Sequence, residues 1–119
     1  MALNEIYRDG DSLPINFGTT DPGVASGEFV VVGSLRGVAE TTATERPDGD
    51  WYATVRFKGV FEATTADAVT VGAPIYLAAA ATNGTAVTTS SGSGANFLVG
   101  YAVNSKGAGA GDIWVRVNN

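Results

Sequence analysis

The side chains of this 119-residue chain that could do acid–base chemistry are carboxylates. Two pairs stand two residues apart with a glycine between them, Asp9 with Asp11 and Asp48 with Asp50. Two carboxylates at a suitable separation can serve as acid and base in glycoside hydrolysis. Asp-Gly is also common in turns, because aspartate bonds to nearby backbone and glycine tolerates positive φ. We interpret both pairs as solvated turns, and neither continues into the twelve-residue ligand series of a calcium loop.

The residue types that most enzymes use near neutral pH are missing. The chain has no histidine and no cysteine, so it lacks the commonest general base, the commonest metal ligand and the Ser–His and Cys–His nucleophile pairs. The glycine-rich stretch Gly107–Gly111 lacks the Lys-Ser/Thr of a phosphate loop and leads into a strand pattern rather than a helix. The sequence therefore predicts no catalytic residue, no metal site and no cofactor.

Charge and length narrow the classes of partner. Twelve acidic residues against seven basic ones give a net charge of −5, which disfavours nucleic acid as a direct partner. No apolar run reaches the roughly 18 residues of a membrane span, so no membrane partner is expected. The first residues lack a basic segment followed by an apolar run, so no signal peptide is expected. The length suits one domain.

A strand pattern that occurs twice in the same order sets the expected fold. Each copy has a glycine turn feeding an apolar strand, then a strand of the form aliphatic-x-Gly-apolar-Ala, then a strand with Val-Arg. The copies comprise residues 26–32, 35–39 and 53–57, and residues 71–77, 98–102 and 113–117. Turn residues recur every ten or so positions, as in β-sandwiches and barrels. We predict a small all-β barrel or sandwich, β-tulip-like, with two related halves, and a jelly-roll-like sandwich as the alternative.

Local patterns refine this prediction. Trp51, Ala53, Val55 and Phe57 alternate with polar residues, which indicates one buried and one wet face. Residues 29–32 and 97–99 do not alternate, so both faces of those strands should be covered. Thr64–Val69 is the best candidate for a helix, of one turn at most. Residues 19–23, 45–50 and 90–95 should connect strands.

The remaining distinctive side chains are aromatic or basic. Exposed aromatic rings could stack on a sugar or a base, but at strand positions we favour core or subunit-interface packing. Arg56 and Arg116 hold equivalent places in the two copies, so each should pair with a carboxylate. The residues expected in the core or at a subunit interface are Phe29, Val31, Trp51, Tyr76, Tyr101 and Trp114.

The order of several motifs resembles the small capsid decoration, or cement, proteins of tailed bacteriophages, a group often mislabelled as RecA/RadA-like recombinases. The resemblance spans nearly the whole chain. It rests on five segments: residues 4–13 (NEIYRDGDSL), the block from Ser26 to Ala39, residues 58–61 (KGVF), residues 71–76 (VGAPIY) and residues 99–102 (VGYA).

The resemblance implies a structural role on the outside of a mature phage head. Such a protein would bridge neighbouring major capsid proteins, often as a trimer, after assembly in the host cytoplasm. Residues 1–18 would be an N-terminal arm and residues 19–119 a β-rich decoration domain. The arm would contact the capsid, with addition of a strand to a sheet edge as one route, through Asn4, Ile6, Tyr7, Arg8, Leu13, Ile15 and Phe17. The alternative function is a carbohydrate- or receptor-binding β module that uses exposed Trp and Tyr side chains.

Overall fold

The computed structural model describes residues 11–78 and 83–118, which form ten strands and no helix. The helix predicted from Thr64 is therefore wrong. Thr64 and Thr65 instead end strand β6 and pair with Asp112 and Gly111. Two β-branched residues suit a pleated strand, and a segment this short cannot offset the cost of nucleating a helix.

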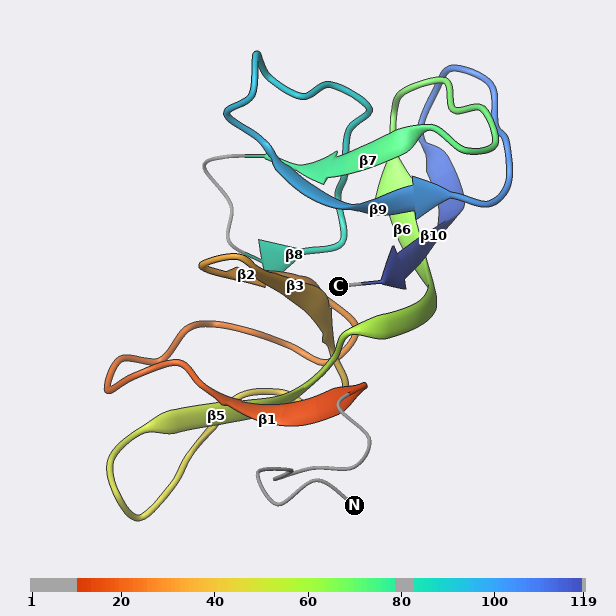
Figure 1. The fold of residues 1–119 in the computed structure, drawn as a ribbon. Helices are drawn as coiled ribbons and strands as arrows, with labels where there is room; N and C mark the ends of the chain where they lie inside the picture. The colour runs from red at the N-terminus through yellow and green to blue at the C-terminus, as the bar shows by residue number, and fades with distance from the viewer. Residues whose placement is uncertain (1–10, 79–82, 119) are drawn as a thin grey trace, which may run out of the picture.

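The strands make two antiparallel sheets (Figure 1). The first has the order β1 (Ser12–Asn16), β5 (Trp51–Arg56), β3 (Leu35–Ala39), β2 (Phe29–Val32) and β8 (Asn83–Gly84), with β4 (Thr44–Glu45) also paired to β5. The second has the order β6 (Lys58–Thr65), β10 (Gly111–Asn118), β9 (Phe97–Ala102) and β7 (Pro74–Leu77). The described residues form no closed barrel, and the all-β, sandwich-like prediction is confirmed.

The two sheets repeat one design. The order β1-β5-β3-β2 in residues 11–57, the first half, matches β6-β10-β9-β7 in residues 58–118, the second half. Backbone hydrogen bonds recur at equivalent places, with the same or nearly the same N···O distances. The pairs are Gly27 N–Ala39 O (2.8 Å) with Gly72 N–Ala102 O (2.8 Å), Ala39 N–Glu28 O (2.9 Å) with Ala102 N–Ala73 O (2.9 Å), Ala43 N–Val24 O (3.0 Å) with Lys106 N–Val69 O (3.0 Å), and Glu40 N–Thr54 O (2.7 Å) with Val103 N–Trp114 O (2.9 Å).

One glycine in each half explains part of the repeated motif. A Cβ atom on Gly37 would lie 2.5 Å from the carbonyl oxygen of Arg56 and 2.8 Å from Cγ1 of Val55. A Cβ atom on Gly100 would meet the carbonyl oxygen of Arg116 and Cγ1 of Val115 in the same way. Only glycine lets the neighbouring strand approach this closely.

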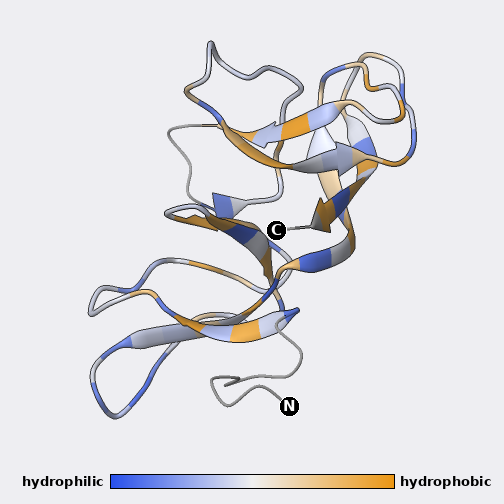
Figure 2. Cartoon of the chain, in the orientation of Figure 1, coloured by the Kyte–Doolittle hydropathy of each residue, from blue (hydrophilic) through white to orange (hydrophobic). Residues whose placement is uncertain are grey.

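Each half buries the inner face of its sheet. Val30, Ala53, Val55 and Phe57 lie in the cluster of the first half, and the partly buried Trp51 packs against it, as the alternation from Trp51 to Phe57 predicts. The second half has its own cluster, built on side chains such as Ile75, Ile113 and Val115. Along β1 and β10 the hydropathy changes from residue to residue (Figure 2), as expected of strands with one buried face.

Strands β2 and β3 are covered on both faces. Val30 belongs to the first-half cluster, whereas Phe29, Val31 and Val38 belong to the cluster of the second half. The prediction that both faces of residues 29–32 are covered is therefore confirmed. For residues 97–99 the covering is partial, because Val99 is buried while Phe97 and Leu98 are half-buried. The outer face of β2 and β3 is thus the seam where the second half packs onto the first.

The segment that begins with β8 links edge strands of the two sheets. β8 extends the first sheet by pairing with β2. The residues after it bond to both edge strands of the second sheet, through Thr64 N–Thr85 O (2.9 Å) at β6 and Tyr76 N–Thr88 O (2.8 Å) at β7. Figure 1 shows this segment passing from β8 toward β6 and β7. Its buried Val87 joins the second-half cluster.

The predicted loops all connect strands. Residues 19–23 lie between β1 and β2, and residues 90–95 lie between β8 and β9. Of residues 45–50, Glu45 ends β4 and residues 46–50 lie between β4 and β5. Within the described residues, no helix has the length and apolar character needed to cross a membrane.

Candidate functional site

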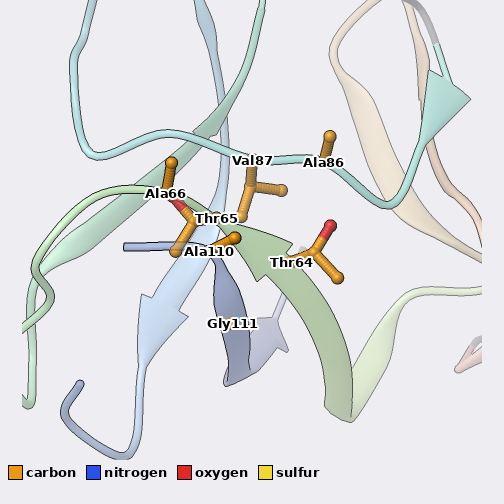
Figure 3. A pocket seen from close by; sticks show the side chains of 7 residues that line it. All are labelled: Thr64, Thr65, Ala66, Ala86, Val87, Ala110 and Gly111. Atoms are coloured by element: carbon orange, nitrogen blue, oxygen red, sulfur yellow. The ribbon is translucent and has the colours of Figure 1, made fainter. Parts of the chain in front are cut away.

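The hollow drawn in Figure 3 carries no acid–base chemistry. It has a volume of about 210 Å³ and is lined by Thr64, Thr65, Ala66, Ala86, Val87, Ala110 and Gly111. None of these side chains titrates or could act as a metal ligand of ordinary strength. Among the described residues there is also no group of three or more His, Cys, Asp or Glu side chains that could hold a metal ion.

The carboxylates Asp48 and Asp50 form the predicted turn. Oδ1 of Asp48 accepts a hydrogen bond from the Asp50 N–H at 2.9 Å, and Gly49 has a φ of 87°. Oδ2 of Asp48 accepts from the Tyr52 hydroxyl at 3.2 Å. Desolvation, together with this carboxylate, raises the pKa of Tyr52 above its ordinary value. The Arg46 guanidinium lies 4.1 Å from the centre of the Tyr52 ring. The pair Asp9 and Asp11 lies partly outside the described residues.

A second polar cluster holds three loops of the second half together. Oδ2 of Asp67 accepts hydrogen bonds from the Thr89 N–H (3.0 Å) and from the hydroxyls of Thr88 (2.9 Å) and Thr89 (3.3 Å). The Thr89 N–H and the Thr88 hydroxyl hold the pKa of Asp67 below its ordinary value. The Lys106 ammonium donates to the carbonyls of Asp67 (3.1 Å), Gly107 (2.7 Å) and Gly109. These groups are satisfied by one another, so the cluster is structural.

The most distinctive surface is the outer face of the second sheet. Tyr101 and Val60 are the strand neighbours of Arg116 on either side, and the backbone of Trp114 accepts a hydrogen bond from Val103 N–H at 2.9 Å. Trp114 is 55% exposed, Val60 54% and Tyr101 51%. We call these five residues (Val60, Tyr101, Val103, Trp114 and Arg116) the outer apolar face. The exposed Glu62, the strand neighbour of Trp114, stands among them. Large exposed apolar patches mark binding surfaces in soluble proteins.

The first half is polar at three of the equivalent places. Glu40 stands where Val103 stands, and Thr54 where Trp114 stands, as the matching backbone bonds show. Ser12 pairs with Arg56 as Val60 pairs with Arg116. The predicted ion pair is present for Arg56, whose Nη1 lies 3.4 Å from Oε1 of Glu40. For Arg116 it is not found: Val103 replaces the glutamate, and no carboxylate among the described residues pairs with the exposed guanidinium.

The residues predicted for the core or an interface separate into three groups. Phe29 and Val31 are core residues at the seam between the halves. Trp51 and Tyr76 are half-buried, whereas Tyr101 and Trp114 are exposed on the outer apolar face.

The residues predicted for capsid contact also divide. Asn4, Ile6, Tyr7 and Arg8 lie outside the described residues. Leu13 and Ile15 of β1, followed by Phe17, are partly buried against the first-half cluster. Capsid contact through the arm stays a prediction.

Val60 and Val103 are the surface residues that sequence reasoning missed. A valine within a strand pattern is expected to be buried in the core. Only the order of the strands in the sheet shows that these two valines are exposed. A signal was available, because aligning the two copies places Val103 against Glu40 and Trp114 against Thr54. Apolar residues that replace polar ones at repeated positions indicate different surroundings for the two copies.

The comparisons with known proteins agree with a structural role. The sequence profile of a family described as phage cement protein matches residues 7–117. Neither a search of curated proteins nor a search of solved structures gives a significant match. Since the profile covers both halves of the duplicated fold and nearly the whole chain, the chain belongs to the phage cement protein family.

Proposed function

We propose that this chain binds the outer surface of a mature phage head and stabilises the shell by bridging neighbouring major capsid proteins. It does so as a homo-oligomer, with a trimer favoured, and assembles in the host cytoplasm. Family membership supports the coarser statement, a structural role associated with a phage capsid. The observation that supports the homo-oligomer in the finer proposal is the outer apolar face, a group of exposed apolar side chains on a duplicated fold.

The physical basis for stabilisation is preferential binding. A protein that binds the mature lattice and not its precursor or its dissociated subunits shifts the equilibrium toward the mature shell by RT ln(1 + [L]/Kd) per site. Linking several such contacts in one oligomer raises the effective concentration of each, so modest single contacts suffice. No bond is made or broken in this function.

We assign the capsid contact to the N-terminal arm, including Asn4, Ile6, Tyr7 and Arg8. The described chain supports a division of roles at this point. From Ser12 onward the backbone is committed to the fold, since β1 pairs with β5 and the Phe57 N–H donates to the Asp11 carbonyl at 2.7 Å. A segment that precedes this anchor can contact a neighbour without altering the sheet.

Deletion of residues 1–10 tests this assignment. We expect the truncated chain to keep its circular-dichroism spectrum and melting temperature but to lose occupancy on expanded, undecorated heads, measured by cosedimentation and imaging. A full-length chain with residues 1–10 replaced by Gly and Ser is the matched control for length. Full occupancy by the truncated chain would disprove the role of the arm, and no binding of the intact chain to any expanded head would disprove the function.

The exposed Trp114 and Tyr101 favour a carbohydrate- or receptor-binding module as the second candidate. Trp114→Ala separates the two candidates. A glycan-binding module would lose affinity in a glycan array with its melting temperature unchanged, whereas a cement protein has no glycan affinity to lose.

A further inference from the structure

The chain itself shows what can cover a face like the outer apolar face. In the first half, the equivalent face of β2 and β3 is buried under the second-half cluster. Val38 and Tyr101 hold the same place in the two halves, since Val38 pairs with Arg56 and Tyr101 with Arg116. Val38 is 3% exposed and Tyr101 is 51% exposed. In the first half this place is therefore covered by another part of the protein. In the second half the same place is exposed.

The residues of the bare face match a protein contact better than a solvent-exposed surface. Ser12, Glu40 and Thr54 of the first half are replaced by Val60, Val103 and Trp114. Ser26, whose hydroxyl donates to the Glu40 carbonyl at 2.9 Å, is replaced by Val71, which is 68% exposed. Five of the six large apolar side chains that are exposed in the described chain thus stand on this face or beside it. Aromatic and arginine residues of this kind dominate the binding energy of interfaces.

Charge indicates which surface fits. Residues 11–57 carry seven acidic and three basic side chains, a net charge of −4, whereas residues 58–119 carry three of each. Arg116 of the outer apolar face has no carboxylate partner among the described residues, although the exposed Glu62 stands on the same face as the strand neighbour of Trp114. Complementary potentials favour contact between this face and an acidic surface, and the first half provides one.

The first half combines carboxylates with an apolar side chain at one place. Trp51 is half-buried at the rim of the first-half cluster. The exposed Glu45 is its cross-strand neighbour, and the exposed Asp48 lies in the turn that joins them. A tryptophan flanked by carboxylates complements an arginine flanked by Val60 and Tyr101.

We propose that the outer apolar face binds the first half of a second copy of this chain, at the surface around Trp51, so that copies associate head to tail. The inference deepens the proposed function, on which it rests for the homo-oligomer, by naming the surfaces and their orientation. A head-to-tail contact uses two different patches on each copy, and it closes into a ring when the rotation between copies allows.

The test replaces residues of the outer apolar face by those that stand at the equivalent places in the first half. In the full-length chain, V60S/V103E/W114T makes the outer apolar face polar and supplies Arg116 with a glutamate. We expect the wild type to sediment as an oligomer and the variant as a monomer with an unchanged far-ultraviolet spectrum. The association constant should fall by about 30-fold or more, as when an interface loses a central aromatic residue.

Leu35→Ser is the matched control, because Leu35 is also exposed, at 46%, but lies in the other sheet, at the start of β3. It should leave the oligomer intact. The proposal is overturned if wild-type protein is a monomer at micromolar concentration, or if the folded triple variant associates like the wild type. If the wild type is a monomer and the triple variant also loses occupancy on heads, the face binds the major capsid protein instead.

Glu45→Lys distinguishes head-to-tail contact from two outer faces meeting each other. Head-to-tail contact predicts weaker association for this variant, and face-to-face contact predicts no change. Should the triple variant fail to fold, Val103→Cys decides, since the chain has no other cysteine. Association should slow its reaction with maleimide, and an unchanged rate in the oligomer would overturn the proposal. Sedimentation and maleimide reaction are measured without the capsid. They can therefore disprove the head-to-tail contact without disproving the proposed function, and the reverse also holds.

Discussion

The two halves of the molecule use one sheet design and differ in what covers its outer face. Inner positions are conserved in kind between them: Val30, Ala39 and Val55 of the first half correspond to Ile75, Ala102 and Val115 of the second, and all six are buried. Outer positions differ in kind. The first half covers part of its outer face with the second half and makes the rest polar, whereas the second half leaves an apolar face exposed.

This difference separates the requirements of folding from those of binding. Inner residues must fill a core, so equivalent places accept similar apolar side chains. Outer residues depend on what lies opposite them. They are a serine, a glutamate and a threonine in the first half, and two valines and a tryptophan in the second. In a duplicated fold, the places where equivalent residues differ most therefore indicate where the two copies meet different neighbours.

The strongest test of the equivalence is to fill the glycine site in each half. We expect Gly37→Ala and Gly100→Ala to destabilise the fold by a similar amount, about 3 kcal/mol, the upper end of the cost of over-packing. In both sites the added Cβ would meet a backbone carbonyl that cannot move without breaking a strand pair. Denaturant unfolding followed by circular dichroism measures the free energies.

Gly107→Ala is the control, because a Cβ atom there meets nothing within 4 Å. It should change the free energy of unfolding by less than about 0.5 kcal/mol. If Gly37→Ala strongly lowers the free energy of unfolding and Gly100→Ala does not, the close strand contacts at the two glycines are not equivalent. That result would remove the basis for comparing the two outer faces.

The next test concerns the place that Val38 and Tyr101 share. Val38→Ala should cost about 2 kcal/mol, because it removes two buried methyl groups from the seam between the halves. Tyr101→Ala should change the stability of the single chain by less than about 0.5 kcal/mol, as at other exposed sites. Unfolding should be measured at the lowest practical concentration, where association contributes least. Equal losses would mean that Tyr101 is as enclosed as Val38, against the exposure on which the proposed interface depends.

Asp67 distinguishes the halves by pH. It joins three loops of the second half, while Pro22 stands at its place in the first. Because its pKa is lowered on folding, its stabilisation is complete above its ordinary value of 3.8 and is lost as the pH falls through the folded value. Asp67→Asn should cost about 1 kcal/mol at neutral pH through weakened hydrogen bonds. Below pH 3.8 the difference from wild type should narrow.

Thr88→Val checks the cause, because it removes one of the donors that lower the pKa of Asp67. The pH-dependent part of the difference should then be smaller, and the narrowing should be complete at a higher pH. A constant difference between wild type and Asp67→Asn from neutral to acid pH would show that the carboxylate charge contributes nothing.

Sequence patterns predicted the strands and the duplication because both depend on local periodicity and on glycines with a steric role, such as Gly37 and Gly100. They also predicted the cover on both faces of residues 29–32. They did not predict which aromatic residues are buried, since Phe29 and Trp114 stand in similar strand patterns and differ only in what the sheet order places opposite them. The helix at Thr64 failed because pairing with β10 outweighs a weak local preference. The pairing of Arg116 failed because its carboxylate position is occupied by Val103.

The smallest expected effect concerns the ion pair that only the first half has. Arg56 and Glu40 are both exposed and 3.4 Å apart, so a double-mutant cycle with Arg56→Met and Glu40→Gln should give a coupling energy below about 0.5 kcal/mol. The same limit applies to a glutamate placed beside Arg116 by Val103→Glu. An ion pair between Arg116 and the new glutamate would stabilise the monomer by too little to account for the loss of association. If V60S/V103E/W114T is a monomer, the cause is therefore the lost apolar contact and the added charge at the interface. A coupling energy above about 1 kcal/mol in the cycle would remove that reasoning and require Val103→Thr in place of Val103→Glu.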